Sequence, residues 1–139
     1  MKIIQRILLI GLAVFMFSSC GLFGQQQYFC EADAVKSVQI VRLDDYIEEE
    51  YRYDYTVLSE IADCSAFADR LNNLDHSVNW GDPMPLYVDY VVILVHYSNG
   101  DYDLLHPDAQ RFHRSGKNQN GYFFFDKGQF DTLIQEYLT

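Results

Sequence analysis

Basic residues are scarce in this sequence of 139 residues, which holds ten Lys and Arg against twenty Asp and Glu, a formal net charge of −10. A protein that binds DNA or RNA needs clustered Lys and Arg to displace counterions from the phosphates. The charge balance therefore excludes a nucleic-acid-binding protein, and it disfavours attraction of the body to an anionic lipid surface. An acidic surface fits a well-solvated domain, and it also suits a cationic protein partner or a cation.

The motifs of common catalytic classes are also missing. The chain has no Gly-x-Ser-x-Gly elbow, no glycine-rich phosphate loop and no His-Glu-x-x-His pair. Carboxylates are plentiful, but a glycosidase needs two of them at a set separation across a sugar site. Spacing along the sequence does not reveal such a pair, so we assign no catalytic residue and no cofactor.

The first twenty residues have the three parts of an export signal. Lys2 and Arg6 give a positive start, residues 7–17 form an apolar run, and two serines lead to Cys20. The run is shorter than the roughly 20 residues that a membrane-spanning helix needs. Residues 17–21, Phe-Ser-Ser-Cys-Gly, resemble the lipobox of lipoprotein signal peptidase, with Phe17 in place of the usual Leu. The resemblance implies cleavage before Cys20, lipidation of its sulfur, and anchorage to a cell membrane or envelope with the domain outside the cytoplasm.

We therefore divide the chain into a signal peptide over residues 1–19, a lipidated Cys20 with a tether over 20–30, and one α+β domain over 31–139. Two cysteines, Cys30 and Cys64, remain in the mature chain, in an oxidising compartment that permits a disulfide. Such a bridge would close a loop of about 35 residues. The sequence does not show that the two approach each other, so a bridge and two free thiols both stay open.

Hydrophobic periodicity predicts the elements of the domain. A strand is expected over residues 35–43, an acidic connection over 44–50, and a half-buried strand over 51–57. A helix follows, with Asp63 or Ser65 as its N-cap, and an apolar run over 88–97 indicates the central strand. The last helix begins after Asp126, with Gln129 completing a capping-box-like pattern. Together they predict an antiparallel sheet of about five to six strands with two helices packed on it.

Asn99-Gly100 predicts a two-residue hairpin turn, since both residues tolerate positive φ. This turn would place Tyr97 opposite Tyr102 and His96 opposite Asp103. A second hairpin is expected through residues 117–121, with residues 122–125 as its returning strand.

The four histidines, with many aspartates, invite comparison with a zinc site, which needs three or four ligands converging at about 2 Å. The predicted register places His96 and His106 on opposite faces of one ribbon. We therefore predict no metal site.

The acidic segment over 44–50 is the best candidate for contact with a protein partner, although a run of like charge is usually a solvated loop. Two tyrosines lie in or beside it, and exposed tyrosine is enriched at protein interfaces. Tyr53 and Tyr55 follow on the next strand. The three tyrosines at 51, 53 and 55 could form a carbohydrate-stacking or protein-binding face, but we expect at least two of them to pack in the core. The candidate partner surface is Asp44, Asp45, Tyr46, Glu48, Glu49, Glu50 and Tyr51.

The body resembles small envelope lipoproteins without known activity. The resemblance lies in the Gly81-Asp82-Pro83 turn, the Asn99-Gly100-Asp101 hairpin and the Phe125-Asp126 start of the last helix. These motifs mark turns and imply no activity. Our hypothesis is a non-catalytic, lipid-anchored binding module with a protein partner in the envelope. The alternative is a hydrolase that acts on envelope carbohydrate through paired carboxylates.

Overall fold

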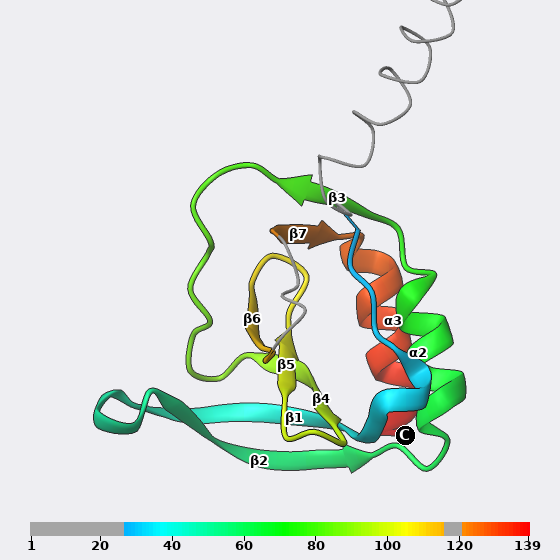
Figure 1. The fold of residues 1–139 in the computed structure, drawn as a ribbon, viewed down its shortest axis with the longest axis horizontal. Helices are drawn as coiled ribbons and strands as arrows, with labels where there is room; N and C mark the ends of the chain where they lie inside the picture. Colours follow the sequence, from blue (N-terminus) through cyan, green and yellow to red (C-terminus); the bar gives the residue numbers. More distant parts are fainter. Residues whose placement is uncertain (1–26, 116–120) are drawn as a thin grey trace, which may run out of the picture.

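The computed structural model describes residues 27–115 and 121–139. A five-stranded antiparallel sheet, a two-stranded antiparallel sheet and two helices form the domain (Figure 1). The predicted α+β class, an antiparallel sheet with two helices, is confirmed. The signal peptide, Cys20 and the connection over 117–120 lie outside the described residues.

The large sheet has the order β2 (Arg52–Glu60), β1 (Val35–Ile47), β4 (Val91–Tyr97), β5 (Tyr102–Leu105), β6 (Gln110–His113). The strand predicted over 88–97 is its central strand, as its apolar character on both faces indicates. Its alternate residues enter two separate hydrophobic clusters, Ile93 and Val95 on one face and Val92 and Leu94 on the other. A sheet buried on both faces needs a cover on each side.

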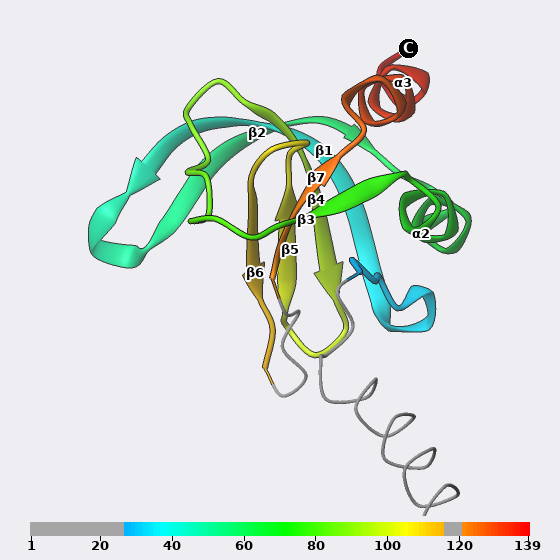
Figure 2. The ribbon, with the colours of Figure 1, turned by 90° about the horizontal axis from the view of Figure 1, so that it is seen from above.

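Two helices, α2 (Cys64–Asn72) and α3 (Lys127–Leu138), cover one face of this sheet (Figure 2). The other face is covered by the irregular segment between β3 and β4, which contributes Leu86 and Tyr90 to the second cluster. Among the described residues no helix is long and apolar enough to cross a membrane.

Aspartates begin both helices, as predicted. The Asp63 carboxylate accepts a hydrogen bond from the Ala66 amide at 3.0 Å, and the Asp126 carboxylate accepts one from the Gln129 amide at 2.8 Å. The rest of the predicted capping box is absent, because the Gln129 side chain bonds to Asp75 through both its amide nitrogen and its carbonyl oxygen. The start of α3 is thereby joined to the chain that follows α2.

The prediction that residues 122–125 return on the preceding strand is wrong. This strand, β7 (Tyr122–Phe125), pairs with β3 (His76–Asn79) in the small sheet. The side chain of Gln110 on β6 supplies the donor and acceptor that a backbone partner would offer. It bonds to both the amide and the carbonyl of Phe123 at 2.8 Å.

The predicted two-residue turn at Asn99-Gly100 is also wrong. Only Gly100 adopts a positive φ, 93°, whereas the predicted turn type requires it at both residues. The Tyr97 amide instead donates to the Asp101 carbonyl at 2.9 Å across a three-residue loop. The register therefore slips by one residue, His96 lies opposite Tyr102, and Asp103 moves to the core face opposite Val95.

The segment before β1 belongs partly to the core. Tyr28 and Cys30, which the sequence analysis assigns to the tether, are buried, and a 3-10 turn η1 (Ala32–Ala34) leads into β1. The packed domain therefore begins at about Tyr28, and not at residue 31.

Candidate interaction surface

The predicted acidic connection over 44–50 is largely strand. β1 continues to Ile47, and only the 3-10 turn η2 (Glu48–Glu50) with Tyr51 connects it to β2. A register shift between Leu43 and Asp45 accommodates the extra residue in β1. The Asp44 carboxylate accepts hydrogen bonds from the Thr56 hydroxyl at 2.6 Å and from Arg42 Nε at 3.0 Å. These contacts allow an acidic segment to remain in a strand.

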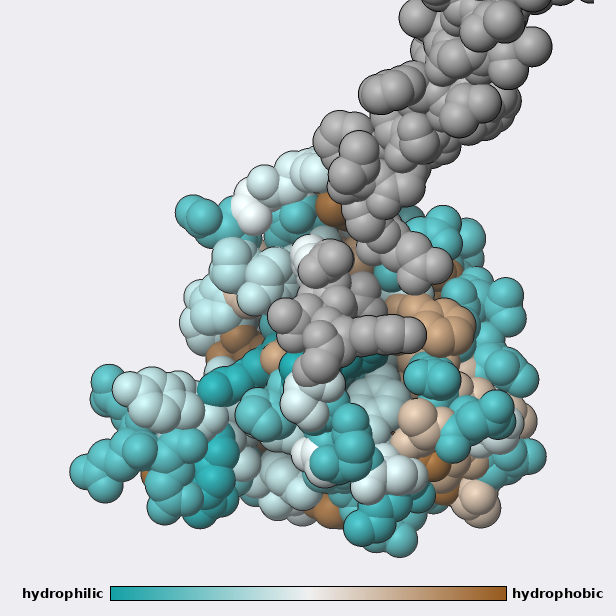
Figure 3. Space-filling model, viewed as in Figure 1, coloured by the Kyte–Doolittle hydropathy of each residue, from teal (hydrophilic) through white to brown (hydrophobic). Residues whose placement is uncertain are grey.

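The β1–β2 hairpin projects from the body of the domain, at the left of Figures 1 and 2. Its end carries all seven residues of the candidate partner surface. Tyr51 is 69% exposed in the left-handed conformation, and Tyr46 is 37% exposed. The projecting end is hydrophilic in the space-filling view (Figure 3). The segment that the sequence singled out is therefore one accessible surface.

The hairpin end is fastened to the far edge of the sheet by Arg111 of β6. Its guanidinium donates to the Tyr51 carbonyl at 2.6 Å and lies 5.8 Å from the ring centres of both Tyr46 and Tyr53. The Tyr53 hydroxyl donates to the Leu86 carbonyl at 3.0 Å, and burial raises its pKa. Because β2 and β6 are the two edge strands, the sheet must curve enough for the Arg111 side chain to reach from β6 to the hairpin end.

Acidic charge is only partly neutralised on this surface. Arg52 forms ion pairs with Glu50 and Asp54. Among the described residues, Glu48 and Glu49 have no ion-pair or hydrogen-bond partner for their side chains. These exposed ion pairs contribute little to stability, because solvent screens them. The two unpaired carboxylates leave the end of the hairpin attractive to a cation.

The expectation that two of the three strand tyrosines pack in the core is wrong. Tyr51 is exposed, Tyr55 is 40% exposed, and only Tyr53 packs against the second hydrophobic cluster. β2 is an edge strand of the sheet. Its side chains point alternately to the two faces, and among the described residues too little packs on either face to bury any of them.

The histidines do not converge. Among the residues that the structure describes, no group of three His, Cys, Asp or Glu side chains is placed to hold a metal ion. His76 accepts a hydrogen bond from the Tyr28 amide at 3.2 Å, and His106 stacks on Tyr90 at 4.1 Å. Burial lowers the pKa of His106. The predicted placement of His96 opposite Asp103 is wrong, because the register slip puts the two residues on opposite faces.

Sequence reasoning missed a buried polar cluster around Asp103. Its carboxylate accepts hydrogen bonds from the Tyr28 hydroxyl at 2.9 Å, the Tyr97 hydroxyl at 2.7 Å and Arg114 Nε at 2.8 Å, and it also forms an ion pair with Arg114. The signal for it was the alternation of Asp101, Asp103 and Leu105 along β5 and its preceding turn, beside the strand β4, which is apolar except for His96. Each of these polar groups has a hydrogen-bond partner within the cluster. Through the bond from Tyr28 to Asp103, the cluster holds the first described residues against the sheet.

Both cysteines are free in the structure, so the bridge that the sequence left open is not formed in it. Cys30 is buried beside the Asp103 cluster, and burial raises the pKa of its thiol. The Cys64 thiol donates to the Ile61 carbonyl at 3.4 Å at the start of α2.

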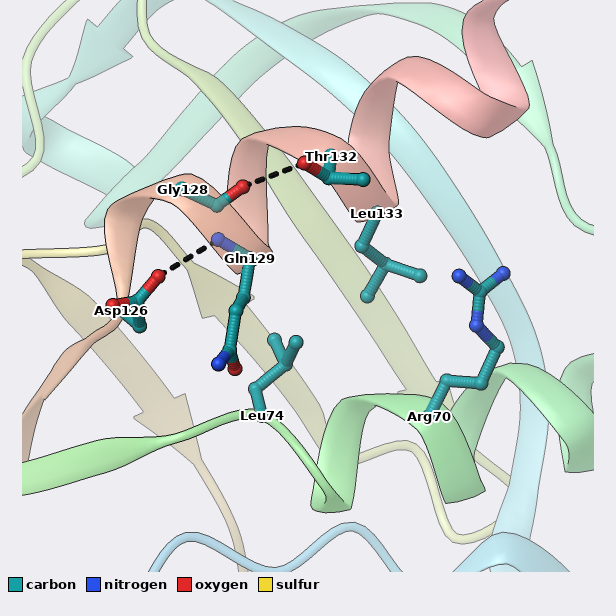
Figure 4. A pocket seen from close by; sticks show the side chains of 7 residues that line it. All are labelled: Arg70, Leu74, Asp126, Gly128, Gln129, Thr132 and Leu133. Carbon is teal, nitrogen blue, oxygen red and sulfur yellow. Dashed lines mark hydrogen bonds between the residues drawn. The ribbon is translucent and has the colours of Figure 1, made fainter.

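A shallow pocket of about 500 Å³ lies between α2 and α3 (Figure 4). Leu74 and Leu133 form its apolar floor, and Arg70 lies at one end, paired with Glu136 at 2.6 Å. Asp126 at the other end caps α3. The polar groups around this pocket are engaged with one another, and none is left aimed into it.

No protein family model, curated protein or solved structure matches the chain significantly. The candidate surface therefore rests on its geometry and charge.

Proposed function

We propose that the protein is a lipid-anchored, non-catalytic interaction module outside the cytoplasm, at the cell membrane or envelope, and that the end of its β1–β2 hairpin binds a protein partner. The observation that carries this proposal is the projecting hairpin, whose end bears acidic residues and exposed tyrosines and is bound by Arg111 at Tyr51 and Tyr46.

Rigidity matters because a partner does not have to order this surface on binding. A surface that is already ordered avoids part of the entropic cost of association. Tyrosine offers contact area with few rotatable bonds, and unpaired carboxylates accelerate encounter with a cationic partner. The hairpin end combines these three properties.

The arrangement of the domain suits an anchored module. The described chain begins beside β3, at the top of Figure 1, where the Tyr28 amide bonds to His76, whereas the hairpin projects from the lower left of the body. A lipid anchor on the preceding residues would leave the hairpin accessible.

The two buried carboxylates are occupied within the fold, which favours the non-catalytic proposal over the hydrolase. Asp103 is bound by Arg114 and two tyrosines, while Asp101 accepts hydrogen bonds from the amide and hydroxyl of Ser115, both at 2.8 Å. Neither carboxylate has the free oxygen, open to a substrate, that a glycosidase acid or nucleophile needs.

The test is a pull-down with the full-length, membrane-processed protein carrying a C-terminal tag. Detergent-solubilised envelope from the source cells is applied at low and at moderate salt. We expect one partner at a fixed ratio, weakened by salt and lost in the Glu48→Lys/Glu49→Lys variant.

A variant with the same change in charge, Asp33→Lys/Asp69→Lys, is the matched control, since these exposed residues lie in η1 and α2, away from the hairpin. It should retain the partner. Recovery of the same partner by both variants, or of none by the wild type, would contradict the proposed function.

A further inference from the structure

The outer edge of β2 is open along most of its length. β2 is the last strand of the large sheet, and among the described residues no backbone hydrogen bond joins it to any segment other than β1. The backbone groups that point away from β1 therefore face solvent. Such an edge is a template on which another extended chain can pair.

Most devices that protect an edge strand are missing from β2. It contains no Lys and no Pro. Of the two register shifts between β1 and β2, one falls at Leu58, towards the end of β2, and the other leaves its extra residue, Asp44, in β1. From Arg52 to Val57 every residue of β2 has a partner in β1. Tyr55 and Val57 present apolar surface there, 40% and 41% exposed.

Charge selects the occupant of this edge. Residues 42–60 hold seven acidic side chains and two basic ones, Arg42 and Arg52. A second copy of the same strand would bring like charges together across the pair, which is destabilising. A segment with Lys or Arg would instead face Asp54, next to the unpaired carboxylates of Glu48 and Glu49.

We propose that the edge of β2, from Arg52 to Val57, accepts an extended basic segment of the partner as an added strand. This inference rests on the proposed function and specifies its chemistry. Main-chain hydrogen bonds supply the affinity, and alternating side chains supply the specificity. Apolar side chains of the segment lie against Tyr55 and Val57, which share a face, while its cationic side chains alternate towards Asp54 and Thr56 on the other face.

Hydrogen exchange on the full-length protein in zwitterionic detergent tests the added strand. The probe is a nine-residue peptide of alternating Lys and Val, matching the nine residues of β2. We expect exchange of the β2 amides to slow by roughly tenfold or more at saturating peptide, with α2 and α3 unchanged.

A peptide control separates backbone pairing from attraction between charges, and a protein variant locates the site. The same peptide with every backbone nitrogen methylated keeps every charge and side chain but has no backbone donor on either edge, and it should give no protection. The Tyr55→Lys/Val57→Lys variant, which adds the charge that protects natural edges, should also lose the effect. Protection that survives N-methylation would overturn the proposed strand pairing, as would protection that appears without peptide and grows with protein concentration.

The two proposals fail differently. A partner that is lost from Glu48→Lys/Glu49→Lys but retained by Tyr55→Lys/Val57→Lys would refute pairing at the edge and leave the interaction module standing. Loss of the partner from both variants, with retention by Asp33→Lys/Asp69→Lys, supports the edge as the docking site.

Discussion

Asp103 shows how one residue of register changes what a side chain does. In the predicted turn it would have been a surface partner of His96, and in the structure its side chain has no solvent exposure. A buried carboxylate is tolerated only when it is paired and hydrogen-bonded, and Arg114 with two tyrosines meets that need. No local pattern in the sequence distinguishes the two turns, because Asn-Gly suits both.

Asp103→Asn should destabilise the domain by about 3–5 kcal/mol, since it leaves the Arg114 guanidinium, only 15% exposed, without its counter-ion. Urea unfolding followed by circular dichroism measures the loss. Asp108→Asn, the same chemical change at an exposed position, should shift stability by no more than about 0.5 kcal/mol. An unchanged midpoint in Asp103→Asn would show that the cluster does not hold the fold.

Tyr28 and Tyr97 make stability depend on alkaline pH. Burial, reinforced by the negative charge of Asp103, raises the pKa of both phenols above the ordinary value of 10.0. The folded protein therefore keeps protons that the unfolded chain releases. Their stabilising contribution is complete below pH 10 and falls above it, by up to about 1.4 kcal/mol per pH unit for each tyrosine. Unfolding free energies measured across this range should decline less steeply in Tyr97→Phe, and an identical slope would refute the linkage.

Elements with one dominant local signal were predictable. In α3 the stripe of Phe130, Leu133 and Ile134 and the cap at Asp126 determine the helix without reference to the rest of the chain. Strand pairing was not predictable in the same way. β7 pairs with β3 and not with β6, and β6 is joined to β7 by hydrogen bonds between the Gln110 side chain and the Phe123 backbone. Such choices depend on segments distant in sequence, which compete for the same edge.

The turn between β4 and β5 offers a test at the scale of an element. Gly100 has φ 93° and open space where a Cβ would lie, so Gly100→Ala meets backbone strain alone, at about 1–2 kcal/mol. Gly128→Ala, in the first turn of α3 at ordinary φ, should instead stabilise by up to about 1 kcal/mol. Urea midpoints that move in opposite directions support the positive φ of Gly100. A fall of equal size in both variants would show that the effect at Gly100 is not conformational.

At the scale of the whole molecule, the candidate surface was only half predictable. Its seven residues are neighbours in sequence, so the sequence alone placed them together. What makes them a rigid surface is Arg111, sixty residues from Tyr51, which reaches the hairpin because the sheet curves. Curvature results from the packing of both faces, and no single segment encodes it. For that reason the sequence predicted the acidic residues and tyrosines of this surface, but not that the hairpin carrying them projects from the domain.

The anchor is the remaining whole-molecule prediction, since Cys20 lies outside the described residues. Cys20→Ala should abolish incorporation of labelled palmitate and move the protein from the membrane to the soluble fraction under alkaline carbonate. Each buried methylene of a lipid contributes about 0.8 kcal/mol to membrane binding, and the chain's twenty acidic residues against ten basic ones offer no electrostatic substitute. Cys64→Ala, which removes a thiol within the domain, should remain membrane-bound and labelled. Palmitate incorporation in the Cys20→Ala variant would place the lipid elsewhere, and its retention on the membrane without label would assign anchorage to the apolar run at residues 7–17.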